Sequence, residues 1–411
     1  MIRGRPLAAA MCGLFAVAAC GGGGSGAPSN SPAAFKGTVK VALVDVFSGS
    51  FGFFGGYLQN SLQVEADELN AKGGLLGYKI EITTADDQLS PDQGASLVRQ
   101  QLADSNVKLL VGPSFTSVFL AAKPIINQSK VPNCLPAVAA DSAMDGAVNS
   151  FRTQEQDRYR IPAVLNYVAK NTQVKKIGLI YEGDATGQSY DQQLGTAAQA
   201  AGLEYVGAAF TTATATDHKP LVQQMIAKGA QGVILSNNST TAGRTALAIQ
   251  QLGVKDKLAQ FGFSGLGGYT YPQLGGDTVD GTIFAATIQS YLTDIPESKW
   301  PATYRDFVKK ITTQYGYSSN GLEMKGTPLA ADCMIEWSKA VQKANAFDGT
   351  KVVKAWEALD IPPTQNVLGV REKFSASNHN AVPQEGIFVY QWAKQADGKF
   401  RLKQLVGPAG S

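Results

Sequence analysis

The sequence predicts an α/β fold with two Rossmann-like lobes, each built on a parallel sheet. Strand-like segments rich in β-branched residues alternate with amphipathic helical segments along the chain. This alternation is interrupted once and then begins again, and 411 residues are too many for one compact core. We therefore expect two α/β domains of ordinary size.

The first strand–turn–helix unit runs from Val39 to Gly77. Val39 to Val44 is an apolar run with Lys40 as its only charge, which is typical of a strand covered on both faces. The turn from Ser48 to Gly56 contains four glycines and three phenylalanines, so its backbone can approach a ligand while rings flank it. Because ligands bind at the carboxyl ends of parallel strands, we expect this turn to contribute to a binding site.

Further strands of the first lobe are expected at Tyr78 to Thr84, Val107 to Val111 and Pro132 to Pro136. Ser90 is placed to cap the helix after the first of these, with Pro91 in its first turn. A helix that ends near Gln128 separates the other two strands. Right-handed crossovers lay strands joined in this way into one parallel sheet.

Ser150 to Thr153 is interpreted as a passage to the second lobe, because a new β-α series follows it. The new series has expected strands at Lys176 to Tyr181, Glu204 to Ala209, Gly232 to Leu235 and Gln260 to Phe263. Its helices begin near Gln156, Gly187, His218 and Thr240.

The last third of the chain is expected to return to the first lobe. Gly281 to Ala286 is a strand-like passage, and helices follow at Ala302 to Tyr315, Pro328 to Ala344 and Lys351 to Leu359. Two alternating segments, Gly386 to Trp392 and Lys399 to Val406, flank Asp397-Gly398, a dipeptide typical of hairpin turns.

The N-terminus is interpreted as a targeting segment. Arg3 and Arg5 precede a short apolar core, and small residues lead to Cys20. This end resembles the bacterial lipobox, which implies that 1–19 is a signal peptide and that Cys20 is lipidated and anchors the chain to a membrane. Ordinary signal cleavage beside an incidental cysteine is the alternative. Residues 20–35 are mostly glycine, serine, alanine and proline, as in a flexible tether.

Charge and cysteine content narrow the function. Without Arg3 and Arg5 the 36 basic residues become 34, against 33 acidic ones, so nothing favours nucleic acid as a partner. No metal-ligand spacing is present, and we expect neither a metal nor a cofactor. Cys134 and Cys333 are the cysteines of the folded body. We expect two buried free thiols, with a disulfide as the alternative.

An enzyme is not expected. His218 and His379 are the only histidines, and neither lies beside a recognisable nucleophile motif. Ser264 lies in G-F-S-G-L, which lacks the final glycine of a nucleophile elbow, and no dinucleotide or phosphate-loop fingerprint occurs.

Several short motifs together resemble those of the type I periplasmic binding proteins of ABC importers, in particular the leucine/isoleucine/valine-binding family. They are V-K-V-A-L-V followed by Ser48-Gly49, N-A-K-G-G from Asn70 to Gly74, Asp86-Asp87, Val111-Gly112, and F-R-T from Phe151 to Thr153. The resemblance extends from about Gly37 to Val406, and it rests on the order and spacing of the motifs.

This resemblance implies two lobes joined by a multi-segment hinge, with a ligand held between them. It assigns 36–152 plus 288–372 to the N-terminal lobe and 153–287 plus 373–408 to the C-terminal lobe. The crossings would be Phe151, Gly281 to Ala286, and Val370 to Phe374. The implied role is capture of a small molecule and its delivery to ABC permease subunits by an exported, lipid-anchored monomer of the cell envelope.

The ligand-binding positions of the family can be carried over to this chain. They correspond to Phe54 in the first turn, Thr116 and Ser117 after the third strand, Ala137 and Ala139 after the fourth, and Thr186, Asn238 and Ser264 in the second lobe; Phe115 lies beside them. Thr116 or Ser117 could instead only cap the helix.

This chain departs from the amino-acid binders at several of these positions. No carboxylate stands at Ser264 or Gly265, where the family places the glutamate that binds an ammonium group, and Asp184 is the nearest acidic candidate. A buried ammonium without such a partner is costly. We therefore expect a partly apolar ligand, such as an aromatic acid or amide, or a molecule like a branched-chain amino acid.

A sensory role is the alternative to transport. The same fold serves as a ligand-binding domain in receptors, so the chain could present its ligand-dependent shape to a chemosensory or two-component signalling system. No membrane-spanning helix follows Cys20 in the sequence, which argues against a one-chain receptor.

Overall fold

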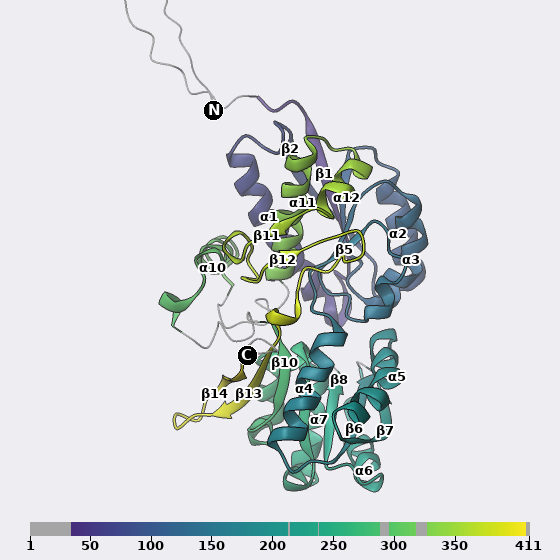
Figure 1. Cartoon of the computed structure of the whole chain (residues 1–411), viewed down its shortest axis with the longest axis vertical. Helices are drawn as coiled ribbons and strands as arrows, with labels where there is room; N and C mark the ends of the chain where they lie inside the picture. The colour runs from purple at the N-terminus through teal and green to yellow at the C-terminus, as the bar shows by residue number, and fades with distance from the viewer. Residues whose placement is uncertain (1–33, 213, 237, 288–295, 318–326, 408–411) are drawn as a thin grey trace, which may run out of the picture. The chain divides into compact units, whose positions relative to one another are not determined.

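The fold was analysed in a computed structural model (Figure 1). The structure describes residues 34–212, 214–236, 238–287, 296–317 and 327–407. The expected signal peptide, the expected lipidation site Cys20 and nearly all of the expected tether lie outside these residues.

The first sheet is entirely parallel and has the strand order β2-β1-β3-β4-β5. Its strands are β1 (Thr38–Asp45), β2 (Lys79–Asp86), β3 (Val107–Val111), β4 (Asn133–Leu135) and β5 (Ser150–Arg152). The four expected strands are confirmed. The interpretation of 150–153 as a mere passage is wrong, because Ser150 to Arg152 pairs with β4 and closes this edge of the sheet before the chain leaves it.

Helices cover both faces of the first sheet (Figure 1). They are α1 (Gly52–Ala71), α2 (Pro91–Leu102), α3 (Thr116–Gln128), α11 (Thr327–Ala344) and α12 (Gly349–Trp356). Val41 and Leu43 share a core with α1, α11 and α12, whereas Ala42 and Val44 share one with α2 and α3. This alternation is the two-residue period of a strand buried on both faces. The side chain of Ser90 accepts a hydrogen bond from the amide of Gln93, so its capping role is confirmed.

The second sheet has seven strands in the order β14-β13-β10-β9-β8-β6-β7. The strands are β6 (Lys176–Glu182), β7 (Glu204–Thr211), β8 (Gly232–Ser236), β9 (Ala259–Gly262), β10 (Ile283–Ala286), β13 (Phe388–Lys394) and β14 (Phe400–Val406). The strands β6 to β10 are parallel to one another, and β13 and β14 form the expected antiparallel hairpin. The expected passage at 281–286 is thus a strand of this sheet.

Helices also pack on both faces of the second sheet. They are α4 (Asp157–Asn171), α5 (Ala185–Ala200), α6 (Lys219–Ala227), α7 (Ser239–Gln251) and α8 (Thr270–Gly275). The helices α4 and α5 share one core with Leu179 of β6, and α6, α7 and α8 share another with Ile180. Among the described residues a further helix, α10 (Ala302–Tyr315), packs in a smaller cluster with Val64 of α1 and Ala331 of α11.

The C-terminal part of the chain passes between the two cores. Leu368 and Val370 belong to a core of the second sheet, whereas Phe374 belongs to a core of the first, so the chain crosses near the expected third crossing. Within this passage β12 (Glu372–Lys373) pairs with β11 (Asp360–Ile361) in a small antiparallel sheet. The exact lobe boundaries stay a prediction.

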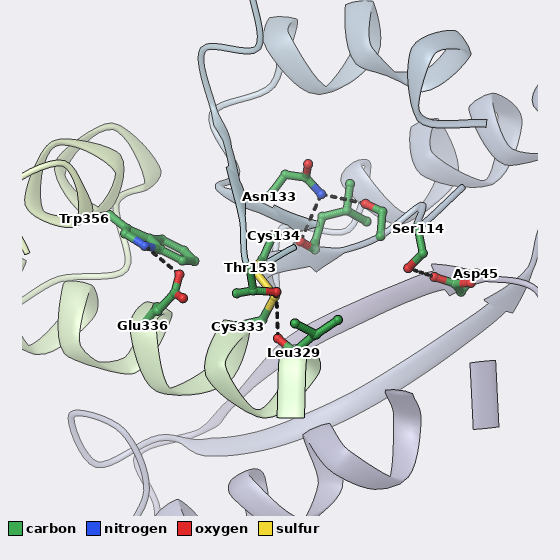
Figure 2. The surroundings of a disulfide bond; sticks show 11 residues. Asp45, Ser114, Asn133, Cys134, Thr153, Leu329, Cys333, Glu336 and Trp356 are labelled. Atoms are coloured by element: carbon green, nitrogen blue, oxygen red, sulfur yellow. Dashed lines mark hydrogen bonds between the residues drawn. A yellow bond between two sulfur atoms is a disulfide. The ribbon is translucent and has the colours of Figure 1, made fainter. Parts of the chain in front are cut away.

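The expectation of two free thiols is wrong, because Cys134 and Cys333 form a disulfide (Figure 2). Cys134 lies in β4 and Cys333 in α11, 199 residues further along the chain, and both are fully buried. The fold brings the two segments together through the packing of α11 on the first sheet, which no local sequence pattern indicates.

We expect the double substitution Cys134→Ala/Cys333→Ala to destabilise the protein. For a cross-link of this sequence separation, the chain-entropy model gives a loss of about 5 kcal/mol, which corresponds to a fall in the melting temperature of about 5 to 10 °C for a chain of this size. Calorimetry of the variant and the wild type measures the difference. An unchanged melting temperature would contradict this prediction.

Candidate functional site

A cavity of about 290 Å³ lies where the carboxyl ends of strands from both sheets meet. Six of the segments that line it follow β1, β3, β4, β6, β8 and β9. Eight of the nine expected site residues line this cavity: Phe54, Phe115, Thr116, Ala137, Ala139, Thr186, Asn238 and Ser264. The exception is Ser117, which lies in the same helix turn as Thr116 but does not line the cavity.

Aromatic side chains form the wall contributed by the first sheet. Phe51, Phe53, Phe54 and Tyr57 come from the turn after β1 and from the start of α1, and Phe115 comes from the turn after β3. The ring of Phe115 lies edge-on to Phe51 and Phe54, with centroids 5.8 and 6.0 Å away. Such edge-to-face contacts hold rings in fixed orientations, so this wall is an ordered apolar surface.

The first turn of α3 brings polar groups into the same wall. Phe115 occupies the N-cap position and no side chain caps the helix, so the capping role considered for Thr116 and Ser117 is wrong. Thr116 is buried and lines the cavity. The first amides of a helix have no partner within it and lie at the positive end of its dipole, which suits a carboxylate or carbonyl oxygen.

Thr116 and Thr186 hydrogen bond to each other. The hydroxyl of Thr186, in the first turn of α5, donates to the hydroxyl of Thr116 at 2.9 Å. Two predicted site residues from helices of different sheets therefore meet directly at the cavity. Thr116 acts here as an acceptor, which leaves its own hydroxyl proton for another acceptor.

Asn238 lines the cavity, but its side chain is engaged within the protein. The amide oxygen accepts from the backbone N–H groups of Thr240 and Thr241, which caps α7, and the amide nitrogen donates to Glu182 at 2.5 Å. The sequence prediction treated Asn238 as a ligand contact and did not foresee this second role.

Two carboxylates line the second-sheet side of the cavity. Glu182 ends β6, and burial raises the pKa of its carboxyl against the hydrogen bond from Thr241 that lowers it. Asp184 accepts a hydrogen bond from the amide of Gly187 and caps α5. Asp184 was singled out from the sequence, but Glu182 was missed, because a glutamate at a strand end gives no local indication of where its carboxyl will lie.

The sequence prediction also missed a buried charge cluster around Arg160 of α4. Arg160 lines the cavity, and its guanidinium bonds to Asp157 at 2.6 Å and approaches Glu155 at 3.5 Å. It donates to the hydroxyl of Tyr190 and, at 3.4 Å, to that of Ser264. The guanidinium is therefore neutralised by protein carboxylates, and it fixes the position of Ser264.

Behind the aromatic wall, a buried carboxyl supports the turn after β3. Asp45 ends β1 and accepts a hydrogen bond from the hydroxyl of Ser114, which lines the cavity (Figure 2). Burial raises the pKa of Asp45 to about 7, against the hydrogen bond from Ser114 that lowers it. Asp45 thus links the end of β1 to the turn that carries Phe115 and Thr116.

The described part of the chain contains neither a candidate metal site nor a candidate membrane span. No group of three or more histidine, cysteine, aspartate or glutamate side chains among the described residues could hold a metal ion. None of the helices in the described ranges is long and apolar enough to cross a bilayer.

Comparisons with known proteins identify relatives along most of the chain. A family model described as periplasmic binding protein matches residues 38–399. Over 262 residues the chain is 26% identical to Leu/Ile/Val-binding protein BraC3 of Rhizobium johnstonii, which covers 64% of this chain and 70% of that protein.

Solved structures share the fold. A periplasmic binding protein type 1 from Bordetella pertussis aligns with a TM-score of 0.79 and 22% identity over 90% of this chain and all of that one. The branched-chain amino acid transporter substrate-binding protein LivJ of Streptococcus pneumoniae, in complex with isoleucine, has a TM-score of 0.73 at 20% identity and covers 90% of this chain and all of its own. A solute-binding protein of an ABC transporter from Rhodopseudomonas palustris, in complex with 4-hydroxybenzoate, has a TM-score of 0.76 at 17% identity, over 90% of this chain and 96% of that one.

We expect Asp45 to make stability depend on pH. Because its folded pKa is raised from 3.8 to about 7, the folded protein retains a proton that the unfolded chain releases. The contribution of Asp45 to the free energy of unfolding is complete below about pH 4. It falls by roughly 4 kcal/mol as the pH rises to 7. Urea unfolding measures the free energy of unfolding across this pH range. In Asp45→Asn this free energy should fall less between pH 4 and 7 than it does in the wild type, because the share due to Asp45 is gone.

The half-buried Asp104 is the matched control for this measurement. A hydrogen bond from Lys40 lowers the pKa of Asp104, so its contribution is lost as the pH falls, in the opposite direction. Asp104→Asn should therefore leave the fall between pH 4 and 7 in place. Parallel curves for Asp45→Asn and the wild type would contradict the assignment to Asp45.

Proposed function

Since the chain belongs to the periplasmic binding protein family, we propose that it captures a small, partly apolar metabolite and delivers it to an ABC importer. The cavity at the carboxyl ends of strands from both sheets is the proposed binding site. The ligand would carry a ring or other apolar body and a carboxylate or amide group.

The observation that carries this proposal is an aromatic wall that adjoins a helix N-terminus in one cavity. Phe51, Phe54 and Phe115 supply apolar contact area, and the start of α3 at Thr116 supplies hydrogen-bond donors and a positive dipole end. A ring would lie against the phenylalanines, with its carboxylate or amide oxygen directed at α3.

The charged side chains on the second-sheet side of the cavity determine which chemical group the other end of the ligand can carry. Arg160 is neutralised by Asp157 and Glu155, and the nearby Glu182 and Asp184 are acidic, so this side disfavours a second anionic group. A hydroxyl, an amide N–H or an ammonium group would find acceptors here. The argument from the sequence against an ammonium group considered Asp184 as the nearest carboxylate. The presence of a second carboxylate, Glu182, in the cavity weakens that argument.

The solved relatives bind ligands of the proposed kind. The Streptococcus pneumoniae protein holds isoleucine and the Rhodopseudomonas palustris protein holds 4-hydroxybenzoate. Both ligands combine a carboxylate with an apolar body. The phenylalanines of the wall favour the aromatic ligand for this chain.

Capture would proceed by closure of the two lobes around the ligand. A ligand that touches both walls binds the closed form more tightly and shifts the equilibrium toward it. The hydrogen bond between Thr116 and Thr186 joins the two sides of the cavity and would contribute to the closed form. Permease subunits would recognise that form.

We place the protein outside the cytoplasm, anchored through lipid on Cys20 and acting as a monomer. The family is extracytoplasmic, and the sequence before Cys20 has the order of charged, apolar and small residues that a lipoprotein signal requires. The tether would let the binding domain reach its permease.

We expect aromatic monocarboxylates to bind, and a thermal-shift screen followed by calorimetric titration measures this. The screen should include 4-hydroxybenzoate, L-phenylalanine, L-leucine, L-isoleucine and L-valine. Thr116→Val should weaken binding about tenfold, because one hydrogen bond to the ligand is lost. Ser117→Ala is the matched control and should bind as the wild type does, because Ser117 does not line the cavity.

If only L-leucine, L-isoleucine and L-valine stabilise the protein, the proposal of an aromatic ligand is wrong. Consumption of the bound ligand during incubation would show an enzyme in place of a binding protein.

A separate experiment tests the anchor. In cells, Cys20→Ser should move the protein from the membrane fraction to the soluble fraction and abolish incorporation of labelled fatty acid, because the acylated side chain is lost. Cys12→Ser is the matched control and should change neither result. A soluble wild-type protein without label would contradict the lipid anchor.

A further inference from the structure

Figure 2 shows the disulfide between Cys134 and Cys333 together with Ser114, one of the residues that line the cavity. The two cysteines do not line the cavity themselves. They are fully buried, and they join the middle residue of β4 to the middle of α11.

The strand β4 holds the turn after β3. The side-chain amide of Asn133 donates to the backbone oxygens of Leu110 at 3.2 Å and Gly112 at 2.6 Å. The amide of Gly112 in turn donates to the backbone oxygen of Cys134 at 2.8 Å. Ser114, Phe115 and Thr116 follow within four residues of Gly112 and line the cavity. The two residues of β4 thus fix the point from which this cavity loop departs.

The same strand leads directly into a second cavity loop. Ala137 and Ala139 follow Leu135, the last residue of β4, and both line the cavity. Leu135 also accepts a hydrogen bond from the amide of Thr153 at 3.2 Å, one residue before the cavity-lining Gln154. Three cavity segments therefore take their positions from β4.

β4 is short for a strand from which three cavity segments take their positions. It has three residues, of which two pair with β3 and all three pair with the equally short β5. Short ladders open locally more readily than long ones, because few hydrogen bonds must break. The disulfide fixes the strand at its centre to α11, a helix of 18 residues most of which are buried.

α11 is itself held firmly and so provides a rigid support. Glu336 accepts a hydrogen bond from the indole of Trp356 in α12 at 3.1 Å, and the hydroxyl of Thr153 donates to the backbone oxygen of Leu329 at 2.9 Å (Figure 2). Leu329 packs in a core of the second sheet, whereas Cys333 packs in a core of the first. The helix therefore connects β4 to both cores.

We propose that Cys134 and Cys333 are positioning residues of the binding site, whose disulfide holds the loops 112–116 and 136–139 in the geometry that receives the ligand. The inference rests on the proposed function in one respect, namely that this cavity takes the ligand. Loss of the bond would loosen both loops and weaken binding even where the protein remains folded.

Hydrogen exchange followed by mass spectrometry tests the proposal without any ligand. The samples are the full chain, the Cys134→Ala/Cys333→Ala variant and Ile311→Ala, whose buried side chain lies in the separate core around α10. Loop amides exchange through local opening, which a loss of global stability leaves unchanged. We expect exchange of peptides covering 112–118 and 136–140 to rise at least about fivefold in the cysteine variant only.

Equal exchange of these loops in the cysteine variant and the wild type would overturn the proposal. A rise in Ile311→Ala of the same size would also overturn it, since the effect would then follow from lost stability. If the Cys134→Ala/Cys333→Ala variant does not fold, the same experiment is done with Cys134→Val/Cys333→Ala, whose side chains fill more of the space of the two sulfurs. Its loops should likewise exchange faster than those of the wild type.

A binding measurement on the same samples uses 4-hydroxybenzoate and L-leucine as probes, well below the melting temperature of each variant. For a probe that binds the wild type, we expect the dissociation constant to rise at least about fivefold in the cysteine variant and to stay unchanged in Ile311→Ala. Unchanged affinity in the cysteine variant would overturn the positioning role but leave the proposed function intact. Binding of neither probe by the wild type would count against the proposed ligand class, and the exchange experiment would then decide the positioning role alone.

Discussion

The parallel arrangement of the strands is the constraint on which the rest of the structure depends. In a parallel sheet every strand ends at the same edge, so the turns that follow β1, β3 and β4 lie side by side, and those that follow β6, β8 and β9 do the same. Two such edges meet at one cavity. Residues far apart in the chain, such as Phe54 and Ser264, are thereby brought to one site.

Much of this arrangement could be predicted from local sequence patterns. The apolar run at Val39 to Val44 and the hairpin around Asp397-Gly398 each carry their structure in a few neighbouring residues, and both predictions are confirmed. The turn positions of the first lobe also follow from the pattern, because a residue just after a strand must lie at the sheet edge. Phe54 lies in the turn that this pattern singled out, whereas Thr116 was assigned through the family resemblance, and both line the cavity.

The side chains missed by the sequence analysis are those whose surroundings depend on distant segments. Arg160 becomes part of the cavity only because α4 packs near Tyr190 of α5 and Ser264 after β9. The pairing of Cys134 with Cys333 depends on α11 returning to the first sheet after 199 residues. Ser150 to Arg152 is too short to show a strand pattern, and its pairing with β4 defines it.

The return of α11 and α12 to the first sheet also governs how the chain can assemble. The face of that sheet that carries Val41 and Leu43 is completed by residues from the last quarter of the sequence, including Cys333 and Trp337. A nascent chain that emerges N-terminus first must therefore keep this apolar face uncovered until almost all of it has appeared. The first lobe is one unit in the folded protein, but its segments are synthesised at the beginning and near the end of translation. Chaperone protection during synthesis therefore matters most for the strands that are made earliest.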